Sequence, residues 1–152
     1  MRFCQVSELI DWIDTFHRAL AEQYSTLADE AVKERAALLL NYLSDHQRLL
    51  AESMEKYEAE AADSLLTTWS DECPDLDLPE SITQLHDALS DKNTQEIIKH
   101  VIEFHDILID MYKALAEKAT NSSVKDLFEN LAEMERQEAM RTVRDAQRLE
   151  DY

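Results

Sequence analysis

Four polar residues occupy positions that helical spacing assigns to the apolar faces of helices: His17, His105, Glu135 and Glu138. Glu135 and Glu138 follow Leu131 by four and seven residues, which is the spacing of one helix face. Charged side chains are rarely buried without a partner, so these residues indicate either a ligand site or a paired polar network. Imidazole nitrogens and carboxylate oxygens are ligands for zinc, iron and manganese.

Two interpretations of this cluster stay open. In the first, the four side chains bind a single divalent metal, zinc, iron or manganese, with Gln47 nearby. In the second, no cofactor is bound and each histidine donates a proton to a carboxylate in a buried hydrogen-bonded network. The small number of carboxylates favours the network. No catalytic residue is predicted, because no Ser/His/Asp or Cys/His arrangement is visible.

An internal repeat relates the positions of these residues. A shift of 88 residues places His17 on His105 and Tyr24 on Tyr112 without a gap. Further identical pairs at the same shift are Phe16 and Phe104, Leu20 and Leu108, Leu27 and Leu115, and Ala28 and Ala116. Chance would give about one identity in sixteen, so a duplication is the better explanation.

The repeat is not symmetric in its polar residues. Glu135 and Glu138 correspond to Gln47 and Leu50, and Leu50 offers no ligand atom. The second copy therefore carries both carboxylates of the predicted cluster.

Each copy predicts two helices joined by a short turn. Apolar residues recur at spacings of three and four in both copies, which is the pattern of an amphipathic helix. We predict hairpin 1 over about 6–62, with its turn near 32–35, and hairpin 2 over about 93–150. In hairpin 2, Ser123 and Asp126 form a capping-box pattern that predicts a helix start.

The segment between the hairpins is acidic and holds both prolines. Residues 57–91 contain no lysine or arginine. Their acids are Glu58, Glu60, Asp63, Asp71, Glu72, Asp75, Asp77, Glu80, Asp87 and Asp91. We predict a crossover over about 63–91, non-helical at its centre, with one short helix from Pro79 to Ser90. A long connection is what a bundle needs when its second and third helices run parallel.

The plan of two hairpins and a long crossover resembles the ferritin-like superfamily, rubrerythrin-type bundles in particular. In that family each hairpin supplies a glutamate from its first helix and a Glu-x-x-His pair from its second. The resemblance places His17 and His105 at the glutamate positions, two turns before a tyrosine. It places Glu135-x-x-Glu138 at one pair position and Gln47-x-x-Leu50 at the other. The resemblance implies a single all-α domain over 1–152, an antiparallel four-helix bundle with a degenerate di-iron site.

Composition restricts the partners. The chain has no glycine, so it has no glycine-rich phosphate loop. Its net charge of −18 repels the backbone of nucleic acids and anionic membranes. We predict no nucleic-acid or membrane partner. A homodimer, or capture of a basic protein by the acidic surface, is the predicted mode of interaction, and a small-molecule pocket between helices is a third alternative.

The two cysteines, Cys4 and Cys73, form no metal-ligand spacing. We interpret them as free thiols of a reducing compartment, with a bridge between them as the alternative. The N-terminal residues show no signal-peptide pattern and no apolar run is long enough to span a bilayer, so the predicted location is the cytoplasm.

Overall fold

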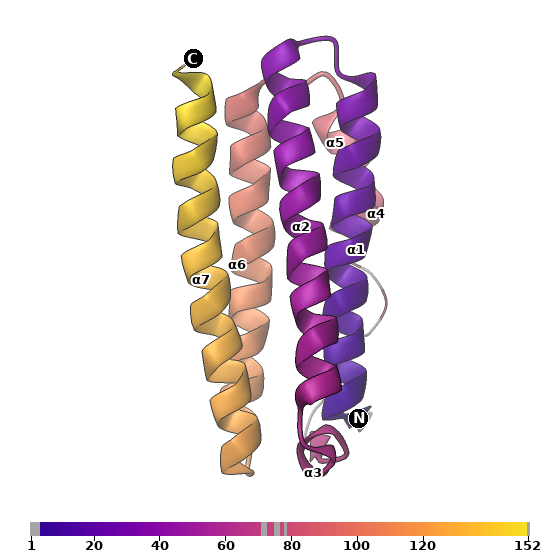
Figure 1. The fold of residues 1–152 in the computed structure, drawn as a ribbon, viewed down its shortest axis with the longest axis vertical. Coiled ribbons are helices and arrows are strands. Elements are labelled where there is room, and N and C mark those ends of the chain that lie inside the picture. Colours follow the sequence, from indigo (N-terminus) through magenta and orange to yellow (C-terminus); the bar gives the residue numbers. More distant parts are fainter. Residues whose placement is uncertain (1–3, 71–72, 75–76, 78, 152) are drawn as a thin grey trace.

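The computed structural model describes residues 4–70, 73–74, 77 and 79–151, and four long helices dominate it (Figure 1). Their bounds are α1 Val6–Glu30, α2 Glu34–Glu60, α6 Thr94–Lys118 and α7 Ser122–Glu150. Helices α1 and α2 form one antiparallel hairpin, and α6 and α7 form the other. The predicted all-α bundle of four main helices is confirmed by this arrangement.

The two hairpins are joined so that α2 and α6 run in the same direction (Figure 1). After α2, the chain passes from one end of the bundle to the other before α6 begins. A short turn can join only antiparallel neighbours, so this parallel arrangement of α2 and α6 requires the long crossover that the sequence predicts.

The helix bounds repeat with the offset seen in the sequence. Helix α1 begins and ends 88 residues before α6, and both contain 25 residues. Residues 31–33 separate α1 from α2, close to the predicted turn at 32–35. The cap of α7 differs from the prediction: Asn121, rather than Ser123, accepts hydrogen bonds from the backbone N–H groups of Ser123 and Val124.

The crossover contains short elements: α3 Asp63–Leu66, β2 Trp69–Ser70, α4 Glu80–Thr83 and α5 Leu85–Leu89. The single helix predicted from Pro79 to Ser90 is divided at Gln84. Its predicted apolar side chains, Ile82, Leu85 and Leu89, are nevertheless buried in the core. Asp71, Glu72 and Asp75 of the predicted acidic run lie outside the described residues.

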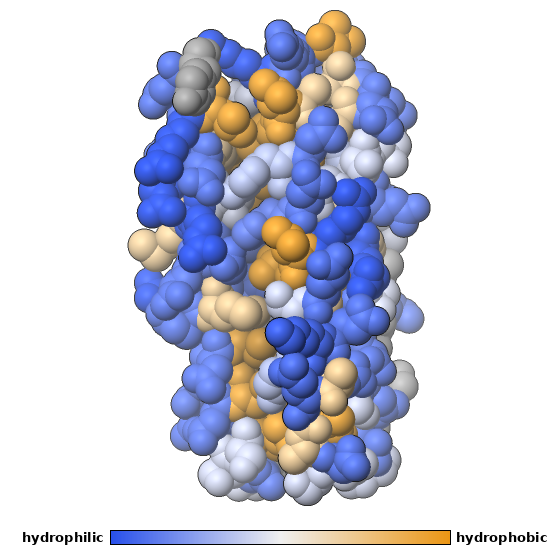
Figure 2. Space-filling model, viewed as in Figure 1, coloured by the Kyte–Doolittle hydropathy of each residue, from blue (hydrophilic) through white to orange (hydrophobic). Residues whose placement is uncertain are grey.

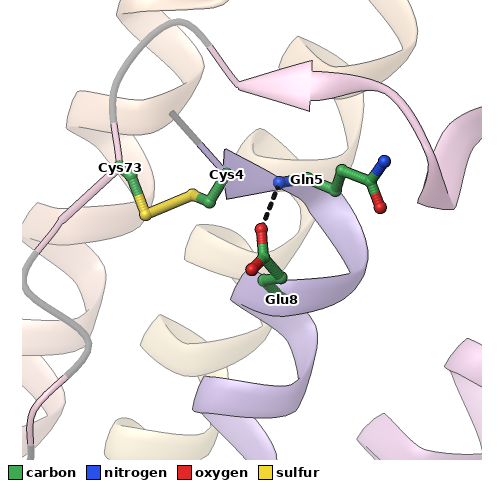
Figure 3. The surroundings of a disulfide bond; sticks show 4 residues. All are labelled: Cys4, Gln5, Glu8 and Cys73. Atoms are coloured by element: carbon green, nitrogen blue, oxygen red, sulfur yellow. Dashed lines mark hydrogen bonds between the residues drawn. A yellow bond between two sulfur atoms is a disulfide. The ribbon is translucent and has the colours of Figure 1, made fainter. Parts of the chain in front are cut away.

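A disulfide joins Cys4 to Cys73, so the interpretation of these residues as free thiols is wrong (Figure 3). Cys4 belongs to β1 (Cys4–Gln5), which pairs antiparallel with β2 of the crossover. This pairing brings the crossover beside the N-terminus, and two cysteines separated by 69 positions in sequence become neighbours. The backbone N–H of Gln5 donates to Glu8 at 2.7 Å and helps to start α1.

Apolar side chains from both hairpins and from the crossover form one core. The visible face in Figure 2 is mainly hydrophilic, with separate groups of apolar side chains along its length. Among the described residues, no helix has the length and apolarity needed to cross a membrane.

Candidate metal centre

The inner part of the polar cluster is built around one carboxylate, that of Glu135 on α7. His105 Nδ1, from α6, donates to Glu135 Oε2 at 2.9 Å. His17 Nε2, from α1, lies 3.2 Å from Glu135 Oε1. The latter contact is close enough for electrostatic attraction but its direction does not make it a hydrogen bond. All three side chains are buried, so the predicted core positions of these residues are correct.

Gln47 on α2 completes the inner part. Its Oε1 lies 2.6 Å from His17 Nδ1, and this buried pair joins α1 to α2. A carbonyl oxygen only accepts hydrogen bonds, so His17 Nδ1 carries the hydrogen. In a neutral ring His17 Nε2 then has a lone pair that faces a carboxylate oxygen. That arrangement is favourable only if Nε2 is also protonated or if a cation lies between the two atoms.

The outer part of the cluster is formed by His46 on α2 and Glu138 on α7. His46 Nε2 lies 2.8 Å from Glu138 Oε2, and the two side chains are 14% and 15% exposed. Arg141 contacts Glu138 Oε1 at 3.3 Å. Tyr42 stacks on His46 and donates its hydroxyl hydrogen to Asp145. This part reaches the surface, whereas the inner part does not.

The structure therefore divides the four predicted residues. It brings His17, His105 and Glu135 together, but Glu138 lies one turn further along α7, beside His46. His46 is not among the residues that the sequence predicted for this cluster. The signal was available, because His46 follows Leu43 by three residues and precedes Leu50 by four.

Opposing effects set the protonation of these groups. Burial alone would raise the pKa of Glu135, but the hydrogen bond from His105, the contact with His17 and the positive charge of these rings lower it to about 2. Burial lowers the pKa of His46, and the attraction of Glu138 works against that effect. Burial, and then the charge of Glu135, raise the pKa of Tyr112 well above its ordinary value. The core thus favours an ionised Glu135.

Buried polar atoms without a hydrogen-bond partner are concentrated in this cluster. Within the described part of the chain they include His17 Nε2, His46 Nε2, His105 Nε2, Glu135 Oε1, Glu138 Oε2 and Tyr112 Oη. Such atoms are rare in native proteins and point to a bound water or ion. Among the described residues, a metal-free network thus leaves these atoms without a hydrogen-bond partner from the protein itself.

These donors do not fit a standard two-iron centre of the ferritin-like type. That centre uses four carboxylates and two histidines, and here the equivalent position of one pair holds Leu50, which has no ligand atom. The first-helix positions hold His17 and His105, so bridging carboxylates are also lacking on α1 and α6.

The donor types do fit one divalent cation of intermediate softness. Histidine nitrogens and carboxylate oxygens face each other from several helices, and a number of them lack another partner. As the side chains stand, however, no three His, Cys, Asp or Glu residues of the described ranges converge on a point where an ion could bind. Binding would require side-chain rotation toward the ion.

Comparison with known proteins bears on the fold. The chain matches the crystal structure of a Thermotoga maritima protein, assigned as ferritin-like and diiron-carboxylate, with a TM-score of 0.63 at 14% sequence identity. The match covers 97% of each chain. The fold is ferritin-like. At this sequence identity the similarity shows the fold and does not indicate whether this chain binds a metal. No family model matches the sequence, and a search of curated proteins gives no match.

Proposed function

We propose that this ferritin-like bundle binds a single divalent metal ion, such as iron, zinc or manganese, in its His/Glu cluster, and that it lacks a standard di-iron centre. The supporting observation is the concentration of unpartnered nitrogen and oxygen atoms on His17, His46, His105, Glu135 and Glu138. A cation would satisfy the carboxylate oxygens and the imidazole lone pairs at the same time, which a histidine–glutamate network alone does not do.

Within this proposal each residue has a defined part. His17, His105, Glu135 and Glu138 form the set from which the ligands come, and Gln47 orients His17. When bound, such an ion supplies Lewis acidity or a redox-active centre, according to the metal. The chain's own contribution is to hold ionised Glu135 between two imidazoles in a site screened from water.

Metal content tests the proposal directly. Purified protein is stripped with chelator, dialysed against ferrous, zinc or manganous ion, and analysed for bound metal by mass spectrometry. We expect one ion per chain, and loss of that ion in the Glu135→Gln/Glu138→Gln variant. Glu133→Gln is the matched control, because Glu133 lies on the exposed face of α7 and pairs with Arg136. Failure of the wild-type chain to bind any of the three ions would overturn the proposal.

A metal-free interaction module is the second candidate. Leu38 and Leu49 on α2 are 53% and 60% exposed, and their spacing of eleven residues places them on one helix face. Met140 on α7 is 62% exposed. These side chains support a homodimer, and the net charge of −18 supports capture of a basic protein. Sedimentation of wild type and of Leu38→Lys/Leu49→Lys tests the dimer, and a strictly monomeric wild type would contradict it.

We also propose a cytoplasmic location for this protein. The Cys4–Cys73 disulfide argues against that location, since disulfides are rare in reducing compartments. Cell fractionation, combined with thiol trapping of the two cysteines before lysis, tests it. Recovery of the chain in the cytoplasm would support the location. Recovery outside it would contradict the proposal.

A further inference from the structure

A cavity of about 120 Å³ lies at one end of the bundle, away from the His/Glu cluster. It forms where the turn between α1 and α2 meets the turn between α5 and α6, and Figure 1 shows both turns at the same end. Its apolar lining residues are buried and come from three helices: Leu27, Ala36, Leu40 and Leu89. An engineered apolar cavity of about 150 Å³ accepts benzene. A branched alkyl group slightly smaller than benzene therefore suits this one.

The mouth of this cavity carries exposed charged residues: Glu30, Lys33, Asp91 and Lys92. Two of them have partners. Glu30 pairs with His86 of α5, and Lys92 lies 3.8 Å from Glu96. Within the described residues, Lys33 and Asp91 form no ion pair. The mouth therefore offers a ligand one positive and one negative charge.

The backbone of Asp91 is held in an unfavourable conformation. Its φ is 60°, in the left-handed region that favours glycine, and no other non-glycine residue of the described ranges has a positive φ. The backbone N–H of Lys92 donates to the carbonyl of Leu89 at 3.2 Å and closes the turn around Asp91. Residues in such conformations are concentrated at ligand-binding and catalytic sites. The turn thus keeps Asp91 at the mouth of the cavity at a conformational cost.

We propose that this cavity binds a small apolar α-amino acid such as leucine, with its carboxylate paired to Lys33, its ammonium group paired to Asp91 and its side chain in the apolar interior. A zwitterion matches both unpaired charges, whereas a fatty acid or an alkylamine leaves one of them unmatched. The net charge of −18 repels a simple anion, and a zwitterion of zero net charge avoids that repulsion. Of the described residues that line the cavity, none belongs to the His/Glu cluster, so this proposal is independent of metal binding.

Calorimetric titration of the full chain with free leucine tests the proposal. We expect a dissociation constant of about 0.1–1 mM, because a ligand of so few atoms gains limited binding free energy. Isocaproate, which lacks the ammonium group, and isoamylamine, which lacks the carboxylate, should each bind about 5-fold more weakly or worse. Free glycine, which has no side chain, should not bind. Absence of leucine binding at about 10 mM would overturn the proposal, and so would isocaproate that binds as tightly as leucine.

Charge variants test the residues at the mouth. Lys33→Gln and Asp91→Asn should each weaken leucine binding by about 3- to 10-fold. Asparagine tolerates the left-handed conformation, so Asp91→Asn removes the charge and keeps the turn. Lys125→Gln and Asp110→Asn change exposed residues nearer the other end of the bundle, and these matched controls should bind as wild type does. Equal affinity of all four variants for leucine would overturn the assignment.

A variant that fills the cavity tests its interior without changing a charge. Ala36→Leu adds apolar volume at the cavity wall, so it should abolish leucine binding while thermal unfolding shows a folded protein of unchanged or higher stability. Ala36→Val is the smaller replacement if the larger side chain overpacks the site. A folded variant of either kind that binds leucine as tightly as wild type does would place the ligand elsewhere and overturn the proposal.

Discussion

The two hairpins have the same geometry but different chemistry. Helices α1 and α6 have the same length and carry a buried histidine and a buried tyrosine at equivalent positions. On the second helices the equivalence ends, since α2 presents Gln47 and Leu50 where α7 presents Glu135 and Glu138. Packing is thus shared by both hairpins, while negative charge in the core is contributed by one of them.

This difference shows that the two hairpins keep the same helix geometry although the polar groups of their second helices differ. Leu50 is buried and fills its position with apolar volume. Gln47 contacts His17 through a neutral amide, where Glu135 of the second hairpin presents a carboxylate. Removing buried charges and filling the space with apolar groups is often neutral or stabilising, so the first hairpin has no need of a second charged pair.

Installing ligand residues in the first hairpin should have the largest effect, because it creates a new site. The Gln47→Glu/Leu50→His variant installs a Glu-x-x-His pair on α2. We expect the bound metal to rise from one ion to two per chain, measured by equilibrium dialysis with ferrous ion. Leu49→His, on an exposed position of the same helix, should leave the ratio at one. A folded double variant that still binds one ion would contradict the expected symmetry.

Removing the inner polar group of each hairpin should affect stability unequally. In stripped protein, Glu135→Leu leaves two buried imidazoles without their carboxylate, and we expect a loss of about 3–5 kcal/mol in the free energy of unfolding. Gln47→Leu leaves only His17 Nδ1 unpaired, with an expected loss of about 1–3 kcal/mol. Urea denaturation monitored by circular dichroism gives both values. Equal losses would show that the charge of Glu135 is not what distinguishes the hairpins.

The disulfide adds a tether to the first hairpin alone. Cys4→Ser/Cys73→Ser should lower the free energy of unfolding by roughly 4 kcal/mol, because the bond closes a long loop in the unfolded chain. Hydrogen exchange should increase at the start of α1 and change little in α6 and α7. Reductant should destabilise wild type and leave the variant unaffected. A uniform increase in exchange over both hairpins would contradict a local tether.

Acid should reveal the carboxylate that only the second hairpin contributes. The pKa of Glu135 is lowered from its ordinary value to about 2 in the folded protein. Its contribution is therefore complete above the unfolded pKa and is lost as the pH falls toward 2, by roughly 3 kcal/mol at most. Stripped Glu135→Gln should show a flatter fall in stability over this range. Glu133→Gln should follow wild type, because solvent screens that exposed carboxylate.

The smallest effect is expected at the tyrosine of the second hairpin. The Tyr112 hydroxyl is buried without a hydrogen-bond partner, so Tyr112→Phe removes an unsatisfied group and keeps the ring that stacks on Phe128. We expect thermal unfolding to change by less than about 1 kcal/mol, in either direction. A loss above roughly 2 kcal/mol would show that a water or ion holds the hydroxyl.

The sequence by itself determined the architecture. Apolar residues at helical spacing and an offset of 88 residues predicted two hairpins, and the observed α1 and α6 have this offset at both ends. The same pattern identified His17, His105 and Glu135 as core residues, because burial follows from the position of a side chain on a helix face.

Only the tertiary structure decided which polar atoms meet. Periodicity says which face a residue occupies but not its depth along that face or its neighbour on another helix, so Glu138 was grouped with His17 although it lies beside His46. The pairing of Cys4 with Cys73 likewise depends on the path of the crossover, which brings β2 next to β1. Contacts between residues distant in sequence are set by the packing of whole helices and strands. A local pattern of apolar and polar residues does not specify that packing.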